Sequence, residues 1–409
     1  MNPRICISGI GVISPLGIGC ESYWASLAAG RDGVSQVNRF DRSPLRCRLG
    51  AQVLDFDAAA LIGAKGLRYI DRLSQFAIAA ARLALEDAGV SLEEIEANRR
   101  GIVLGTAFGG LTSQQDFNRE RVLEGPQWVS PMKFPNTPIN ALSYQIPIRF
   151  QMKLVNVTIS SGMTSSLEAM RYAGLMLRRR PDALLLCGGV EELSFLAYYG
   201  TYFMNELAGI SGDEISCPFD QRRNGYILGE GGALMVLETL QGLEQRRGKG
   251  LAEIRGYGSA FAPRQGNLAV KINAVATAMQ TAIQNAAIQP HQIDYIAASA
   301  NSGPQTDLIE AKAVAQVFGE KASSIPISAI KSMLGEAFGA SGALQVAAAI
   351  LALQRGILPP TINIETLDPE CSCINCLTEM GRRREVRYAL VNSIDRYGSV
   401  VSLVLGRIE

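Results

Sequence analysis

Histidine is nearly absent from this sequence: the 409 residues include only His291, in the polar stretch QPHQID. We expect His291 to lie away from any site, which excludes a histidine base. Long apolar runs are also absent. The longest, at residues 343–353, contains Gln345 and is shorter than the roughly 20 residues of a membrane span. A formal net charge of +1 gives no indication of nucleic acid or an acidic membrane as a partner.

The eight cysteines form no metal-ligand pattern. CSCINC, at residues 371–376, offers three thiols where structural zinc needs four ligands, so we expect a surface loop and no metal. Most of the cysteines lie in apolar strands, as reduced core residues of cytoplasmic proteins do. The N-terminal MNPRICISGIGVISPLG has no basic cluster and predicts a buried strand and turn, not a signal peptide. We therefore expect a cytoplasmic protein.

The stretch NVTISSGMTSSLEAM, residues 156–170, predicts a strand, a tight turn and the start of a helix. Ser165 stands three residues before Glu168, the spacing of a helix capping box. Such a turn often holds a nucleophile, because the helix N-terminus stabilises a developing anion. Here the turn presents Met163, whose thioether has no proton to lose.

One long pattern occurs twice along the chain. Residues 84–110 and 282–303 each end a helix, pass through a polar link and enter an apolar strand with a Gly-containing loop. Residues 155–181 and 325–359 each give a strand, a Ser/Gly-rich loop and an apolar helix. Strands that alternate with such helices predict an α/β protein whose sheets are covered by helices.

The helices expected at residues 165–177 and 342–353 are apolar nearly all round. A helix of that kind is buried on all sides, so we expect both to lie between two sheets. The duplication then predicts five layers, α-β-α-β-α, from halves at residues 1–249 and 250–409. The charged stretch EQRRGKG, residues 244–250, would link the halves.

This duplicated layout resembles the thiolase fold, and three long stretches are similar to the β-ketoacyl synthases. They are GIGVISPLGIGCESYWASLAAGRDGV, CPFDQRRNGYILGEGGALMVLE and KSMLGEAFGASGALQVAAAILALQRGILPPTIN. The resemblance covers essentially the whole chain in order. It implies a thiolase-like fold and no cofactor.

The resemblance fails at the positions that carry the family's chemistry. Met163 stands at the position of the elbow cysteine, Ser299 at that of the first histidine and Glu336 at that of the second. Lys331 is the polar position that is kept. A methionine sulfur cannot ionise, and each donor to the enolate oxygen is typically worth ~3–4 kcal/mol. Because a lone buried charge is costly, we expect Glu336 to pair with Lys331.

An emptied reaction centre in this scaffold resembles the chain-length factor, the ketosynthase β subunit of type II polyketide synthases. The resemblance implies that the chain is not an enzyme by itself. It implies a heterodimer with a catalytic ketosynthase, joined through the strand LVNVTIS, and an acyl carrier protein that brings the polyketide chain. It implies neither nucleic acid nor membrane as a partner.

Two other functions stay open at this point. One is a homodimeric scaffold that binds acyl carrier protein without chemistry. The other is an acyltransferase with a relocated nucleophile, such as Cys217 or a serine of the elbow.

Three apolar side chains are candidates for the wall of an acyl tunnel. Phe108 stands where the family places a smaller pocket residue, so its ring would shorten a cavity. Met132 and Phe134 could do the same from across a dimer interface. Ordinary core is the favoured interpretation of each aromatic residue over a tunnel wall, since aromatic residues dominate cores and interfaces alike.

Overall fold

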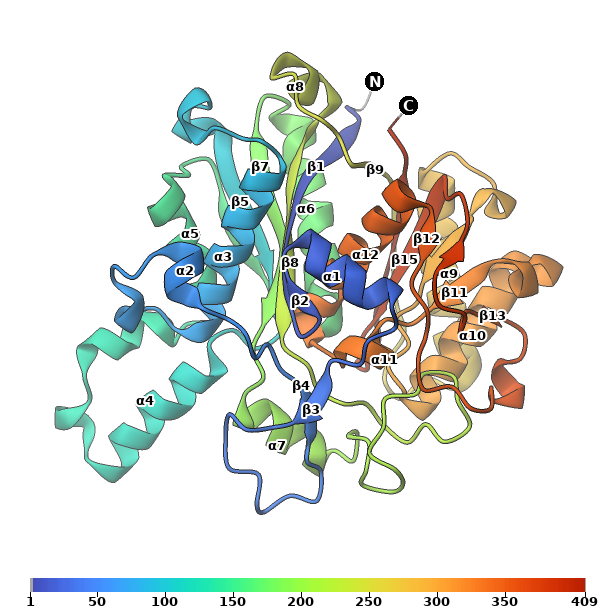
Figure 1. Ribbon diagram of the computed structural model, residues 1–409, viewed down its shortest axis with the longest axis horizontal. Coiled ribbons are helices and arrows are strands. Elements are labelled where there is room, and N and C mark those ends of the chain that lie inside the picture. Colours follow the sequence, from blue (N-terminus) through green and yellow to red (C-terminus); the bar gives the residue numbers. More distant parts are fainter. Residues whose placement is uncertain (1–2, 409) are drawn as a thin grey trace.

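A computed structural model describes residues 3–408 and shows two sheets side by side (Figure 1). The first half supplies β1 (Ile5–Ser14), β5 (Arg100–Gly105), β6 (Asn156–Ile159), β7 (Leu184–Glu191) and β8 (Gly231–Thr239). The second half supplies β9 (Ala252–Phe261), β10 (Tyr295–Ala297), β11 (Pro326–Ser328), β15 (Tyr388–Ile394) and β16 (Ser399–Gly406). β1 and β9 pair over Ile5 to Ile7 and join the sheets.

The two halves repeat one strand order. It is β1-β8-β7-β5-β6 in the first half and β9-β16-β15-β10-β11 in the second. In each, the first two pairings are antiparallel and the next two are parallel. Parallel pairs need a crossover of a dozen residues or more, usually a helix, which explains why helices alternate with these strands. The predicted duplicated α/β fold is confirmed.

Helices cover the outer faces and fill the space between the sheets (Figure 1). The outer face of the first sheet packs on α3 (Arg72–Asp87), and that of the second on α9 (Leu268–Asn285) and α10 (Pro304–Phe318). Between the sheets lie α6 (Ser165–Arg179) and α12 (Ser341–Arg355). The five predicted layers are therefore present.

The two central helices differ in burial. All of Ser341–Leu353 in α12 is buried, as its apolar sequence predicts. The prediction was wrong for α6, which exposes Arg171, Tyr172 and Leu175. α6 lies against β5, β7 and β6, and β6 is the last strand of its sheet. No further strand of residues 3–408 continues the sheet past β6, so one face of α6 stays open.

Residues 111–140 project from the first half. They include α4 (Leu111–Leu123) and a series of short helical turns, at the lower left of Figure 1. Val122, Trp128, Met132 and Phe134 are 74, 70, 61 and 58% exposed. Large exposed apolar side chains are thus concentrated in this projecting segment.

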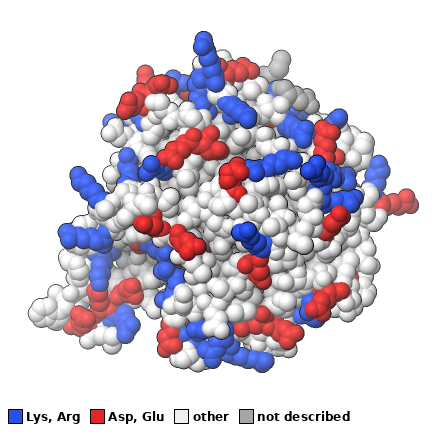
Figure 2. All heavy atoms as spheres, viewed as in Figure 1, with Lys and Arg blue, Asp and Glu red and all other residues white. Residues whose placement is uncertain are grey.

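The CSCINC segment is less exposed than predicted. Cys371 is fully buried, and β13 (Asn375–Cys376) pairs with the edge of β11. Within residues 3–408, no three histidine, cysteine or acidic side chains are placed to hold a metal ion. No helix in this range is long and apolar enough to cross a membrane. Lys, Arg, Asp and Glu are interspersed over the face shown in Figure 2.

Candidate functional site

The elbow predicted at residues 156–170 is present, with a cap that differs from the prediction. β6 ends at Ile159, a 3₁₀ turn covers Gly162–Thr164, and α6 starts at Ser165. The Ser165 hydroxyl accepts from the Ser161 N–H at 2.9 Å and donates to the Gly162 carbonyl at 2.6 Å. The Ser165 hydroxyl therefore closes the turn with these two hydrogen bonds. It does not form the expected capping box with Glu168.

Met163 is held at the bottom of the elbow by its backbone. Its N–H donates to Asp395 Oδ2 at 2.8 Å, and its carbonyl accepts from the Ser393 hydroxyl at 2.9 Å. Asp395 also accepts from the Tyr397 N–H at 2.6 Å. The Asp395 carboxylate, from a loop distant in sequence, thus occupies the N-terminal end of α6. An oxyanion would otherwise be stabilised at this position.

Gly162 makes this approach possible. Its φ of +62° lies in the left-handed region, and a Cβ at this position would overlap the Asp395 carboxylate. Burial raises the pKa of Asp395 above its ordinary value, although the Met163 and Tyr397 N–H groups act to lower it. Asp395 is therefore the titratable group beside Met163.

Ser299 serves the backbone and not the cavity. It follows β10, and its Oγ accepts from the Ile394 N–H at 2.9 Å. Its carbonyl accepts from Lys331 Nζ at 2.8 Å. The Ser299 side chain does not line the cavity beside Met163, so it replaces neither the position nor the chemistry of an imidazole donor.

The predicted pair of Lys331 and Glu336 is confirmed. The Lys331 ammonium lies 2.8 Å from Glu336 Oε2, and the two side chains are 3 and 0% exposed. Glu336 also accepts from Asn301 Nδ2 at 2.8 Å and from the Ser341 hydroxyl at 2.6 Å. These contacts supply hydrogen-bond donors to both oxygens of the buried Glu336 carboxylate. Neither Lys331 nor Glu336 lines the cavity beside Met163.

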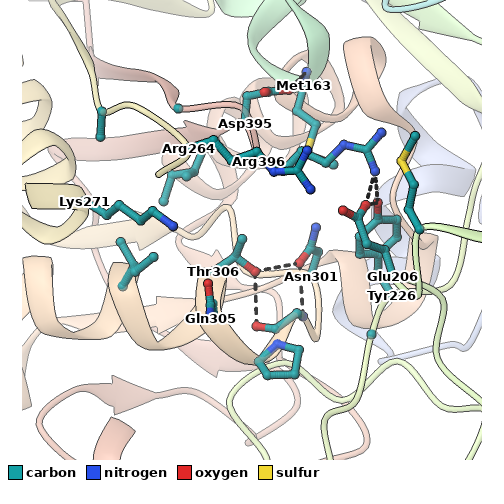
Figure 3. A pocket seen from close by; sticks show the side chains of 18 of the residues that line it. Met163, Glu206, Tyr226, Arg264, Lys271, Asn301, Gln305, Thr306, Asp395 and Arg396 are labelled. Carbon is teal, nitrogen blue, oxygen red and sulfur yellow. Dashed lines mark hydrogen bonds and ion pairs between the residues drawn. The ribbon is translucent and has the colours of Figure 1, made fainter. Parts of the chain in front are cut away.

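A cavity of about 760 Å³ opens beside Met163 (Figure 3). This volume lies within the range of small-molecule sites, roughly 300–1,000 Å³. Its lining comes from both halves of the chain. The labelled polar residues are Glu206, Tyr226, Arg264, Lys271, Asn301, Gln305, Thr306, Asp395 and Arg396.

One wall of the cavity is a charged network. Arg396 forms an ion pair with Glu206, and Glu206 also accepts from the Tyr226 hydroxyl at 2.6 Å. Arg396 donates to the same hydroxyl at 3.2 Å. The network ties the loop after β15 to the loop after α7 (Phe195–Phe203).

Met163 also belongs to an apolar cluster that contains aromatic rings. Met163 is 2% exposed and belongs to the same apolar cluster as Phe108 and Phe338. The two phenylalanine rings meet edge to face with centroids 4.9 Å apart. Phe108 does not line the cavity, so its assignment to a tunnel wall stays a prediction, as do those of Met132 and Phe134.

Among residues 3–408, the predicted relocated nucleophile Cys217 and two hydroxyl groups of the elbow show no activation. Cys217 is buried, and burial raises the pKa of its thiol to about 11. At the elbow, the hydroxyl groups of Ser160 and Thr164 donate to backbone carbonyls. Asp395, Glu206 and Arg396 were missed from the sequence. Asp395 and Arg396 lie in the polar loop NSIDRYGSVV, residues 392–401, whose charged residues were the available signal, whereas Glu206 had none.

The fold and the elbow define a thiolase-like condensing-enzyme scaffold, and comparison with known proteins identifies its family. The Beta-ketoacyl synthase N-terminal domain matches residues 2–242, and the C-terminal domain matches residues 251–365. The chain belongs to the β-ketoacyl synthase family.

Curated relatives and solved structures agree with this assignment. The chain is 33% identical to 3-oxoacyl-[acyl-carrier-protein] synthase 2 of Coxiella burnetii over 99% of both chains. It is 31% identical to the protein of that name from Synechocystis, over 99% of this chain and 98% of that one. The ishigamide ketosynthase/chain length factor gives a TM-score of 0.92 at 28% identity, and a β-ketoacyl synthase from Burkholderia phymatum gives 0.89 at 28%. Both cover 100% of each chain.

These relatives correct the expected function. We expected a non-catalytic chain-length factor that is not an enzyme by itself. Curated relatives that match the full chain at 30–33% identity are named as synthases, which are enzymes. The expectation is therefore wrong. It rested on the residues that stand at the family's catalytic positions, Met163, Ser299 and Glu336.

Proposed function

We propose that this chain is an enzyme of acyl-chain elongation that acts on thioesters of an acyl carrier protein. The observation that carries the proposal is the full-length similarity to enzymes named 3-oxoacyl-[acyl-carrier-protein] synthase 2. A structural relative at 25% identity is a ketosynthase in complex with its acyl carrier protein. The cavity beside Met163 is the binding site that we assign to the thioester.

The chemistry at this site differs from acyl transfer to a thiolate. Acylation of the Met163 sulfur would give an unstable sulfonium, so we propose that the thioester stays on its carrier. Asp395 lines the cavity, and burial raises the pKa of its carboxyl group, so we assign proton exchange with a bound thioester to this side chain. Asn301 keeps one amide hydrogen beyond its bond to Glu336 and can donate it to a thioester oxygen.

We further propose that a second subunit of the same fold covers β6. This strand is the last of its sheet and pairs only with β5 among residues 3–408. An open edge strand is a template for pairing with another chain. The exposed Trp128, Met132 and Phe134 add an apolar surface suited to such a partner. Eight free cysteines support a cytoplasmic location.

Turnover of a carrier-bound thioester tests the proposal. The full-length protein is mixed with malonyl- and hexanoyl-acyl carrier protein, and the mass of each carrier thioester is followed with time. We expect conversion by the wild type and at least roughly a hundredfold slower conversion by Asp395→Asn, the typical effect of losing a general acid or base. Asp182→Asn, at an exposed site, is the matched control. Carrier thioesters that stay unchanged with wild-type protein would contradict the proposal.

A further inference from the structure

The side-chain amide of Asn301 is held at both of its ends. Its oxygen, Oδ1, accepts from the Gly303 N–H at 3.1 Å and from the Thr306 hydroxyl at 3.1 Å. Its nitrogen, Nδ2, donates to Glu336 Oε2 at 2.8 Å. Because an amide oxygen has two lone pairs and an amide nitrogen has two hydrogens, these contacts leave one hydrogen of Nδ2 for a ligand.

These contacts permit only one orientation of the amide. The Gly303 N–H can only donate, so it requires the amide oxygen on its side. The Glu336 carboxylate, paired with Lys331, can only accept, so it requires the amide nitrogen on its side. The free hydrogen therefore has a fixed place on a side chain that lines the cavity. Figure 3 shows this amide with its oxygen bonded to Thr306.

Glu336 is itself fixed by buried contacts. Its Oε2 also accepts from the Lys331 ammonium at 2.8 Å, and its Oε1 accepts from the Ser341 hydroxyl at 2.6 Å. The Lys331 ammonium donates in addition to the Ser299 carbonyl at 2.8 Å. Lys331, Glu336 and Asn301 are all buried, so water does not compete for these bonds. Since Glu336 does not line the cavity, it can act on a ligand there only through Asn301.

We infer that Glu336 is a positioning residue, which holds Asn301 as a hydrogen-bond donor to the carbonyl oxygen of the bound thioester. Lys331 supports this role because it balances the buried charge of Glu336. A donor fixed before the ligand arrives needs no reorganisation when negative charge develops on that oxygen. The inference rests on the proposed function, since it concerns the thioester assigned to the same cavity.

Two probes that differ by one carbonyl group test this role. Both are analogues of hexanoyl-N-acetylcysteamine in which a methylene group replaces the sulfur. The ketone probe keeps the carbonyl group, and the alkyl probe has a second methylene group in its place. Calorimetry on the full-length protein gives the two dissociation constants. We expect the ketone probe to bind the wild type at least about fivefold more tightly, which corresponds to one net hydrogen bond.

Two double variants differ in whether an acceptor faces Asn301. Lys331→Met with Glu336→Leu removes both buried charges and also the acceptor. Lys331→Met with Glu336→Gln removes both charges too, but the glutamine oxygen can still accept from Asn301. We expect the affinity ratio to fall below about twofold with leucine and to keep its wild-type value with glutamine. Asn301→Ala should likewise bring the ratio close to one.

The outcomes separate this inference from the proposed function. A merely structural role of Glu336 would change both affinities together and leave their ratio unchanged, so a ketone preference that survives with leucine overturns the inference. Loss of the preference in both double variants, or no preference in the wild type, overturns it as well. The expected order of ratios in a protein that converts no carrier thioester supports the inference and contradicts the proposed function. The probes contain no thioester, so their affinity ratio does not depend on catalysis.

Discussion

The two halves of the chain contain the same elbow in two different surroundings. In the first half, a 3₁₀ turn at Gly162–Thr164 leads into α6, and Ser165 accepts from the Ser161 N–H at 2.9 Å. In the second half, the turn Phe338–Ala340 leads into α12, and Ser341 accepts from the Ala337 N–H, also at 2.9 Å. The serine that closes the turn therefore makes the same hydrogen bond to the backbone N–H four residues earlier in both halves.

What lies over each elbow differs. The first elbow faces the cavity, and its helix N-terminus binds the Asp395 carboxylate. The second elbow is sealed, and its serine donates to Glu336, which pairs with Lys331 inside the protein. The same local unit is thus enclosed in the protein in one half and borders a cavity in the other. The surroundings decide between these roles.

The largest expected effect is at the sealed elbow. Lys331→Met removes the cation from a pair that is almost fully buried and leaves the Glu336 charge without its partner. We expect the free energy of unfolding, measured in urea, to fall by about 3–5 kcal/mol. The double variant Lys331→Met, Glu336→Leu should recover most of this loss. A single-variant loss below about 1 kcal/mol would show that the pair does not hold the second elbow.

Two buried carboxyl groups near the elbows predict a pH dependence of stability. Burial raises the pKa of Glu191, which accepts from the Gly339 N–H of the second elbow, to about 8, and that of Glu310, which accepts from the Ser299 N–H, to about 7. Between their ordinary values and these values, the folded state binds more protons than the unfolded state. Stability should therefore fall as the pH rises, by at most about 1.4 kcal/mol per pH unit for each group.

Urea unfolding at pH 5.5, 7 and 8.5 measures this slope. A stability that rises over the same interval would contradict the protonation assigned to these two glutamates. Burial raises the pKa of Glu192 to about 7, so this group adds to the same slope.

A smaller effect is expected at the open elbow, where one glycine admits the carboxylate. Gly162→Ala places a Cβ against Asp395 at a φ of +62° and should cost about 1–3 kcal/mol. Gly174→Ala, in the middle of α6 with open space around it, is the matched control and should stabilise by about 0.5–1 kcal/mol. Equal effects of the two changes would mean that Asp395 does not require Gly162.

The fold was predictable from the sequence because both halves repeat strand, loop and helix in one order. The Lys331–Glu336 pair was also predictable, since the two residues are five apart in a segment too apolar to leave a charge alone. The Met163–Asp395 contact was not, because it joins residues 232 positions apart and depends on the backbone angle of Gly162. The open face of α6 was missed because apolar composition does not reveal that β6 ends its sheet.

The last prediction concerns reactivity: Met163→Cys shortens a buried side chain and should cost at most about 2 kcal/mol through the cavity that it leaves. A helix N-terminus normally lowers the pKa of a thiol, but the Asp395 carboxylate beside this position opposes that effect. We expect slow alkylation by iodoacetamide, and about tenfold faster alkylation when Asp395→Asn is added. Equal rates in both variants would show that Asp395 does not control the first elbow.

The proposed function requires that the cavity at Met163 binds a carrier thioester and that no acyl group is transferred to this chain. Intact-mass measurement of both polypeptides, during a single turnover with malonyl- and hexanoyl-acyl carrier protein, tests this most directly. We predict that the mass of a carrier thioester changes while this chain keeps its unmodified mass. An acyl adduct on this chain would contradict the account.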